Sequence, residues 1–133
     1  ELHVTSTHYD DQIALDLVRG SQRTVAIHGC EGNESVAYIG GSDDRLIELI
    51  TESLEDIGIS VREAPHHISG TQENNIVNMT QTQGGVQLEL TAQLRKELFK
   101  NRKSSRNNRE NKDNWDDLMY DFADAMKKAI ERA

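Results

Sequence analysis

A histidine and a glutamate near the ends of two expected strands could act together in catalysis. His28 closes the compact apolar run over residues 24–28, and Glu89 lies late in the alternating run over residues 86–90. Sites in open α/β sheets form at the carboxyl ends of strands, so the two side chains meet at one rim if these strands are neighbours. A neutral imidazole there can bind a metal ion, and a carboxylate beside it can accept a proton from water.

The same two residues also have a purely structural interpretation. His28 could hydrogen-bond a loop carbonyl, and Glu89 could pair with a nearby guanidinium such as that of Arg95. The spacing of the residues along the chain leaves both interpretations open, because it does not say whether the two strands are adjacent.

The remaining histidines and the cysteine give weaker signals. His8 lies at a strand-to-helix turn, whereas His3 lies near the beginning of the same run and is expected to be structural. His66 and His67 follow the single proline in a surface loop and are expected to be solvated. No third group that could orient a cysteine nucleophile is evident, so we expect Cys30 to be a partly buried free thiol.

Alternating strand and helix patterns must position these residues. Apolar periodicity predicts strands over residues 2–7, 24–28, 36–39, 59–62 and 86–90, and helices over residues 10–20, 42–57, 91–100 and 115–132. Several of the strands are apolar on both faces, as in sheets that are covered on both sides. The pattern therefore predicts an α/β three-layer sandwich on a mixed, largely parallel sheet, with residues 1–133 forming a single domain.

Composition and charge limit the partners. The 133 residues carry 15 Lys and Arg against 23 Asp and Glu, a net charge of -8 that argues against general binding of nucleic acid or of an anionic membrane. No apolar run approaches the ~20 residues of a membrane-spanning helix. The single cysteine excludes an intramolecular disulfide, and we expect no signal peptide within these 133 residues.

Residues 100–112 differ from the rest of the chain. This segment has six basic residues and one acidic residue, so that the other residues, 9 basic and 22 acidic, carry a net charge of -13. Because it has no apolar residues to bury, we expect a mobile basic loop. It also lacks the interleaved aromatic residues that would favour nucleic-acid binding.

Five motifs in order resemble the poly-γ-glutamate hydrolase family of phages and their bacterial relatives. They are Leu-His-Val-Thr-Ser-Thr-His-Tyr-Asp at residues 2–10, Ile-His-Gly at 27–29, Tyr-Ile-Gly-Gly at 38–41, Asn-Ile-Val-Asn at 75–78 and Gly-Val-Gln-Leu-Glu-Leu at 85–90. The resemblance extends to about residue 100. It implies zinc-dependent hydrolysis of γ-glutamyl amide bonds in poly-γ-glutamate, on a fold similar to that of zinc carboxypeptidases.

The resemblance also implies roles for individual residues. His28 matches the family's downstream zinc-ligand histidine, and Glu89 matches the carboxylate expected to be the general base. Arg95 matches a basic position that could hold a substrate carboxylate by a bidentate contact. The other matching positions are expected to line or support the pocket, and they are His3, His8, Asn75 and Asn78.

One part of the family's site is missing from this sequence. The resemblance places the other two zinc ligands upstream, in a His-Ala-Gly-Gly-Ile-Glu type segment that does not occur here. We therefore expect this chain alone to bind zinc weakly and to hydrolyse nothing. Together with the absent initiator methionine, this predicts a C-terminal part that lacks its first strands. A second copy or a complementing N-terminal fragment would then cover the exposed sheet edge.

Two functions therefore stay open from the sequence. One is zinc-dependent hydrolysis of poly-γ-glutamate, and the alternative is a non-catalytic module that binds this or a similar acidic polymer. The sequence leaves the compartment open, although a phage or capsule-degrading bacterium would use such an enzyme outside the cell after release or export.

Overall fold

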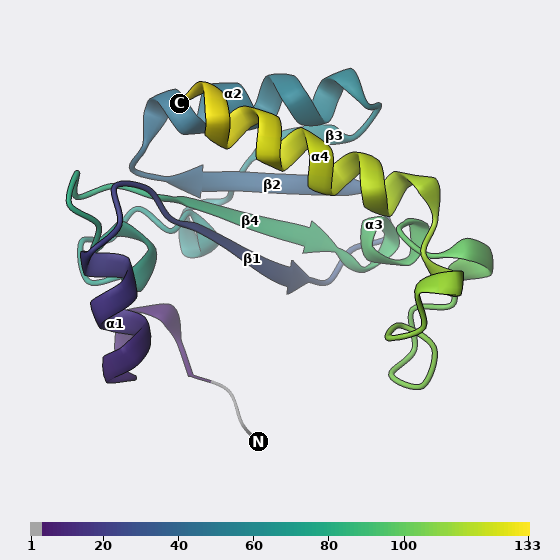
Figure 1. The fold of residues 1–133 in the computed structure, drawn as a ribbon, viewed down its shortest axis with the longest axis horizontal. Helices are drawn as coiled ribbons and strands as arrows, with labels where there is room; N and C mark the ends of the chain where they lie inside the picture. The colour runs from purple at the N-terminus through teal and green to yellow at the C-terminus, as the bar shows by residue number, and fades with distance from the viewer. Residues whose placement is uncertain (1–3) are drawn as a thin grey trace.

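A mixed sheet of four strands forms the centre of the protein, as seen in a computed structural model that describes residues 4–133 (Figure 1). The strands are β1 (Val25–Cys30), β2 (Val36–Gly41), β3 (Ser60–Glu63) and β4 (Val86–Thr91). Their order across the sheet is β1-β4-β2-β3. β1 is parallel to β4 and β2 is parallel to β3, whereas β2 and β4 are antiparallel.

Four helices and five short 3-10 turns accompany the strands within residues 4–133. The helices are α1 (Gln12–Arg19), α2 (Asp44–Asp56), α3 (Ala92–Glu97) and α4 (Asp117–Arg132). The 3-10 turns are η1 (Ser6–His8), η2 (His66–Ile68), η3 (Ile76–Asn78), η4 (Lys100–Arg102) and η5 (Lys112–Asn114). Within residues 4–133, no helix is long and apolar enough to cross a membrane.

The α/β class, the mixed sheet and all but one of the expected elements are confirmed. The strand expected over residues 2–7 is wrong in its described part, where the chain instead turns into η1. The backbone amide of His8 donates to the carbonyl of Thr5 at 2.8 Å and closes that turn. Alternating apolar and polar residues form a strand only where a partner strand accepts their backbone hydrogen bonds.

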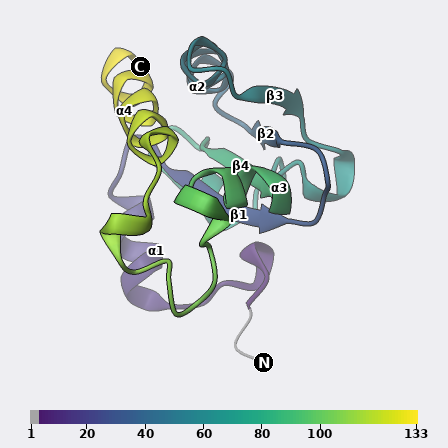
Figure 2. The ribbon, with the colours of Figure 1, turned by 90° about the vertical axis from the view of Figure 1, so that its right-hand side faces the viewer.

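The core lies between the sheet and the two longest helices, α2 and α4, which pack side by side over one face (Figures 1 and 2). Each helix presents apolar residues at intervals of three and four, and these form one buried stripe. The buried side chains include Leu46, Leu49, Ile50 and Leu54 of α2, Phe122, Ala125, Met126 and Ala129 of α4, and Val86, Leu88 and Leu90 of β4.

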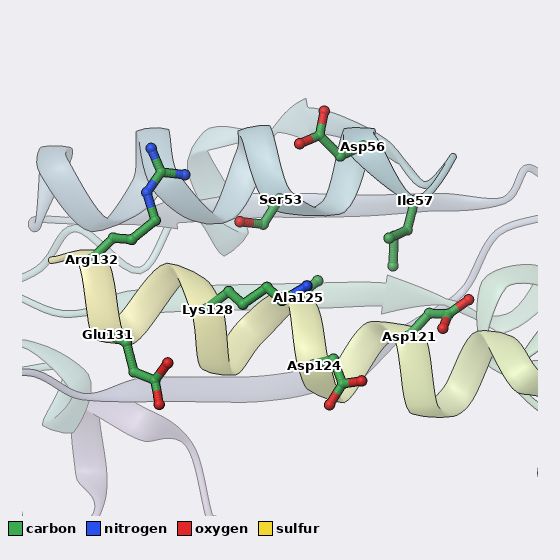
Figure 3. A pocket seen from close by; sticks show the side chains of 9 residues that line it. All are labelled: Ser53, Asp56, Ile57, Asp121, Asp124, Ala125, Lys128, Glu131 and Arg132. Carbon is green, nitrogen blue, oxygen red and sulfur yellow. The ribbon is translucent and has the colours of Figure 1, made fainter.

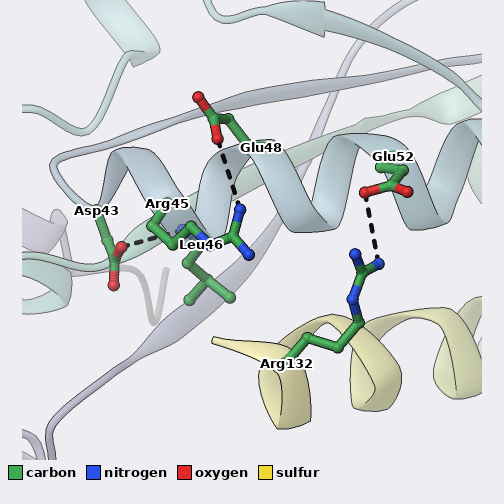
Figure 4. Close-up of polar contacts among 6 residues, drawn as sticks. All are labelled: Asp43, Arg45, Leu46, Glu48, Glu52 and Arg132. Carbon is green, nitrogen blue, oxygen red and sulfur yellow. Dashed lines mark hydrogen bonds and ion pairs between the residues drawn. The ribbon is translucent and has the colours of Figure 1, made fainter.

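Polar contacts at the helix surfaces supplement this core (Figure 4). The carboxylate of Asp43 accepts a hydrogen bond from the backbone amide of Leu46 at 3.0 Å and caps the N-terminus of α2. Arg132 of α4 pairs with Glu52 of α2 at 3.4 Å. Because both partners of this ion pair are exposed, it contributes little to stability.

The opposite face of the sheet carries polar residues and irregular chain. Side chains alternate between faces along a strand, so Gln87 and Glu89 project away from the helices that bury Leu88. The loop over residues 64–73 reaches this face next to Gly40, where a Cβ would collide with the carbonyl oxygen of Ser69. Glycine at this position therefore lets the loop lie against β2, and η3 and α1 complete the thin third layer.

Apolar side chains are exposed around β1, which forms one edge of the sheet. The side chain of Ile27 is 56% exposed, although its partner on β4, Leu88, is fully buried. On the nearby part of the chain, α1 exposes 74% of Ile13 and 68% of Leu17 while it buries Leu15. Helices α2 and α4 therefore cover β2 and β4 but leave β1 open.

Candidate functional site

The two residues that the sequence pointed to first lie side by side. β1 and β4 are adjacent and parallel, and His28 is directly opposite Glu89 in their register. Residues opposite each other in parallel strands project from the same face, so both side chains point away from α2 and α4. Tyr38 on β2 is the partner of Glu89 on its other side. An imidazole, a carboxylate and a phenol therefore form a row across the sheet.

His28 and Glu89 also line one cavity of about 370 Å³. Its floor is formed by strand residues, including Gln87, and its walls come from residues 4–7 and from the loop over residues 66–70. Asn75 completes the lining on the side of η3. Chain segments far apart in sequence thus converge on this one hollow over β1 and β4.

Burial controls the charge of Glu89. Its side chain is only 8% exposed, and removal from water raises the pKa of the carboxyl group above its ordinary value. A carboxylate whose pKa is raised binds a proton more strongly and is a better general base near neutral pH. Glu89 is thus a buried carboxyl group with a raised pKa on the polar face of a central strand.

A buried amide pair forms another part of the cavity wall. The Asn75 side chain donates to Oε1 of Gln87 at 3.1 Å and accepts from the backbone amide of Val77 at 3.0 Å. Gln87 in turn donates to the carbonyl of Ile68 at 3.3 Å. These bonds connect β4 to both loops that surround the cavity, so they hold the lining in place.

Asn78 supports the loops from outside the lining. Its side-chain amide donates to the carbonyls of Gly70 and Gln72 at 2.6 and 3.0 Å, and its oxygen accepts from the amide of Gly85 at 3.1 Å. All three bonds go to the backbone, so the side chain has little capacity left for substrate. The structure thus places Asn78 as a support and Asn75 in the wall.

Arg95 lies at the ends of β1 and β4 rather than in the lining of the cavity. Its Nε donates to the carbonyl of Leu90 at 3.2 Å and its Nη2 donates to the carbonyl of Cys30 at 3.0 Å. These bonds hold an exposed guanidinium at the ends of β1 and β4, against Gly29, which projects from the opposite face of β1 to His28. The ion pair between Arg95 and Glu89 that the structural interpretation allowed is not among the salt bridges of residues 4–133.

The other histidines divide into two groups. His66 and His67, which the sequence placed in solvent, are exposed as expected, but they also line the cavity. His8 is exposed and lies outside the lining, although the neighbouring residues 4–7 contribute to it. His3 falls outside the described residues. The sequence contained no local signal for His66 and His67, because the close approach at Gly40 determines where their loop lies.

Gln87 also lines the cavity, although the sequence did not single it out. A signal existed, because Gln87 precedes Glu89 by two residues on the same strand and therefore shares its face. Cys30 shares the corresponding face of β1 and is a half-buried free thiol, as expected. Burial raises the pKa of this thiol, the carboxylate of Glu89 raises it further, and the charge of Arg95 lowers it.

The described residues do not make a complete metal site. Across residues 4–133, no group of three or more His, Cys, Asp or Glu side chains could hold a metal ion. A catalytic zinc ion takes three protein ligands and keeps one open position. His28 is the residue best placed to provide one of the three, because it lies at the cavity beside the buried carboxylate.

A second hollow, of about 380 Å³, lies between α2 and α4 (Figure 3). Its lining consists mainly of helix-surface side chains, such as Asp56 of α2 and Asp124 and Lys128 of α4. It contains none of the strand residues discussed above and lies on the opposite face of the sheet from His28 and Glu89. The cavity at β1 and β4 is therefore the better candidate for a functional site.

Comparison with known proteins gives a consistent family. The family model described as poly-gamma-glutamate hydrolase matches residues 1–125. The SPbeta prophage-derived UPF0714 protein YoqZ of Bacillus subtilis (strain 168) is 33% identical over 133 residues, which cover 98% of this chain and 47% of YoqZ. The chain spans about half the length of the curated relatives it matches.

Two solved structures are similar over nearly the whole chain. The structure of a bacteriophage poly-gamma-glutamate hydrolase superposes with a TM-score of 0.91 at 32% identity, covering 98% of this chain and 62% of that one. A zinc-free apo structure of YndL superposes with a TM-score of 0.88 at 26% identity, covering 98% and 63% of the two chains.

Proposed function

Because the chain belongs to the poly-γ-glutamate hydrolase family, we propose that it carries the catalytic base of an enzyme that hydrolyses γ-glutamyl amide bonds in that polymer. The observation that carries this proposal is the register of β1 and β4, which sets His28 beside the buried Glu89 in one cavity. The likeness to the bacteriophage hydrolase over 98% of the chain supports it.

Glu89 acts as the general base in this proposal. Its carboxylate takes a proton from the attacking water while the water oxygen bonds to the scissile carbonyl carbon. The protonated Glu89 then delivers that proton to the leaving amine as the C–N bond breaks. The raised pKa of Glu89 suits both steps, because a group that holds its proton moderately well can accept and release it near neutral pH.

We further propose that His28 is one ligand of a zinc ion whose remaining ligands come from polypeptide outside this chain. Two observations support the proposal. The described residues hold too few donors for a complete site. The structure of YndL named zinc-free is a close structural match. The chain by itself is then expected to bind zinc weakly, because one imidazole is a poor site.

Poly-γ-glutamate carries a free α-carboxylate on every residue, so its recognition requires positively charged side chains that donate hydrogen bonds. Arg95 is proposed to hold one such carboxylate at the ends of β1 and β4, since its exposed guanidinium is fixed there by the carbonyls of Leu90 and Cys30. Asn75 is proposed to contact substrate from the cavity wall, whereas contacts from His3 and His8 stay predictions.

The open edge at β1 suggests where the missing ligands enter. A further strand alongside β1 would pair with its free edge and cover Ile27. If that strand ran parallel to β1, its carboxyl end would lie at the same rim as His28. We therefore propose that the polypeptide supplying the ligands also supplies this strand, and that pairing of two copies at β1 is the competing arrangement.

A chimera tests the function. In this chimera, residues 1–133 replace the matching segment of the bacteriophage hydrolase, whose remaining residues are kept. The length of poly-γ-glutamate incubated with the chimera is followed by size-exclusion chromatography. We expect the chimera to bind about one zinc ion and to shorten the polymer. We expect Glu89→Gln to abolish cleavage and Glu55→Gln, a change at an exposed glutamate of α2, to preserve it.

The same experiment separates hydrolase from binding module. A folded, zinc-loaded chimera that binds the polymer without shortening it would support the non-catalytic alternative. Cleavage that survives Glu89→Gln would instead show that the base has been assigned to the wrong residue. Circular dichroism and zinc content, measured on every variant, show whether a loss of cleavage reflects a loss of fold.

A further inference from the structure

Residues 100–112, named here the basic loop, form a closed structure. At its base, the backbone amide of Asp116 donates to the carbonyl of Leu98 at 3.0 Å, and Phe99 and Trp115 form an antiparallel bridge. The two arms of the chain are therefore joined where the loop leaves the body of the protein. Mobility of the loop stays a prediction, but its ends are held a fixed short distance apart.

Side chains also organise the interior of the basic loop. The indole nitrogen of Trp115 donates to the carbonyl of Arg109 at 2.8 Å, and the amide of Asn114 donates to the carbonyl of Asn108 at 2.9 Å. Asn108 itself donates to the hydroxyl of Ser105 at 2.9 Å. Side chains of Asn108, Asn114 and Trp115 thus form hydrogen bonds that shape the loop.

The charges of the basic loop point into solvent. All six basic side chains are exposed, and they are Lys100, Arg102, Lys103, Arg106, Arg109 and Lys112. None of them takes part in the ion pairs found within residues 4–133, which involve Arg45, Arg62, Lys127 and Arg132. Lys112 lies 5.7 Å from the ring of Trp115. A net charge of +5 is therefore concentrated on a protein whose other residues sum to -13.

The position of the basic loop relates it to the candidate site. β4 leads directly into α3, and α3 into the loop, so the loop projects beyond the end of the sheet at which β1 and β4 finish (Figures 1 and 2). Arg95 lies on α3 between Glu89 and the loop. Cationic groups therefore continue along the chain from the ends of β1 and β4 into the basic loop.

We propose that the basic loop is a second contact surface for poly-γ-glutamate, which binds polymer residues beyond those held in the cavity. The proposal rests on the proposed function. A protein with a net charge of -8 repels a polymer with one carboxylate per residue, and a local positive surface offsets that repulsion and steers the polymer toward the site. Binding at two places on one chain also raises the overall affinity.

A polycarboxylate fits the basic loop better than a nucleic acid does. Single-stranded nucleic acids are bound by aromatic side chains on which bases stack, and residues 100–112 contain no Phe, Tyr or Trp. The adjacent Trp115 is already engaged, since Lys112 lies over its ring and Tyr120 packs with a centroid distance of 6.0 Å. The loop therefore offers exposed charge without a stacking surface.

Charge-neutralising variants of this chain test the proposal. The triple variant Lys103→Gln, Arg106→Gln, Arg109→Gln changes side chains that make no contacts described above. The matched control Arg19→Gln, Arg45→Gln, Lys128→Gln removes the same charge from exposed residues of α1, α2 and α4. Affinities for long poly-γ-glutamate and for a γ-glutamyl trimer are measured at low and at physiological salt.

We expect the loop variant to lose about tenfold or more in affinity for the long polymer at low salt, with a smaller loss in the control. We expect the trimer to occupy the cavity alone, so its affinity should not change. The difference between loop variant and control should shrink at high salt, because screening weakens exposed charges. Equal losses in the two triple variants would overturn the proposal.

Two further outcomes keep the loop and the cavity distinguishable. Long-polymer binding that depends on the loop, without any trimer binding, would count against the proposed cavity function but support the loop. Conversely, the trimer could bind while the loop variant keeps full affinity for the long polymer. That result would support the cavity function and overturn the proposed role of the loop. A single-stranded polynucleotide serves as competitor, and competition as strong as that of poly-γ-glutamate would overturn the choice of a polycarboxylate partner.

Discussion

Gly29 lies directly against the guanidinium of Arg95. A Cβ at position 29 would be 2.9 Å from Cζ of Arg95 and 3.0 Å from its Nε and Nη1, closer than side chains normally approach. The glycine next to His28 therefore leaves the space in which Arg95 reaches the carbonyls of Leu90 and Cys30. The conformation of the rim thus depends on a residue that itself carries no side chain.

Gly29→Ala should displace Arg95 and weaken its two hydrogen bonds. We expect a loss of about 1 kcal/mol in the free energy of unfolding, measured by urea denaturation. In a double-mutant cycle, the same substitution should cost much less once Arg95→Ala has removed the guanidinium. Additive losses would show that the contact between the two residues does not determine the effect.

Glu89→Gln should stabilise the chain at neutral pH. Burial raises the pKa of Glu89 in the folded protein, so folding favours the protonated form. That contribution is complete below the unfolded pKa of about 4.3, and it is lost as the pH rises through the folded value. Glu89→Gln has no group that must give up a proton at this position. Its free energy of unfolding should therefore exceed that of the wild type by nearly nothing at acid pH and by the largest amount at neutral pH.

Urea denaturation of the wild type and of Glu89→Gln, from acid to neutral pH, measures this difference in the free energy of unfolding. Glu55→Gln is the control, since Glu55 is exposed on α2 and its change should shift stability little at any pH. An equal stability difference at all pH values would contradict a buried, proton-binding Glu89.

The thiol of Cys30 should react slowly with alkylating reagents at pH 7, because its raised pKa leaves little thiolate. Two substitutions should change the rate in opposite directions. Glu89→Gln removes a charge that raises the pKa and should speed the reaction, whereas Arg95→Ala removes one that lowers it and should slow the reaction. Rates followed by mass spectrometry against pH give the pKa in each variant.

Asn78→Ala should be strongly destabilising. The substitution leaves the carbonyls of Gly70 and Gln72 and the amide of Gly85 without their partner in a buried place. We expect a loss of roughly 2 to 4 kcal/mol in the free energy of unfolding. Asn74→Ala, at an exposed neighbouring position, should have little effect, and a similar loss there would argue against the specific role of Asn78.

The pattern of residues along the chain predicted most of the helices and strands, and it singled out His28 and Glu89 among the residues of the site. Buried strands such as 86–90 and the amphipathic C-terminal helix have strong periodicity, because one face of each is buried. His28 and Glu89 could be singled out because glycine and apolar neighbours marked them as polar residues at the ends of core strands. The strand expected over residues 2–7 was wrong, since its pattern had no partner strand to satisfy it.

Adjacency and loop placement were decided by the tertiary structure alone. No local pattern states that β4, the last strand in the chain, inserts between β1 and β2, yet this insertion sets His28 beside Glu89. His66 and His67 reach the cavity through the contact of their loop with Gly40, and Arg95 reaches the rim through the space at Gly29. Residue types and periodicity thus determined which elements form and which groups could do chemistry. Long-range packing decided which of those groups meet, because it depends on contacts between residues far apart in the chain.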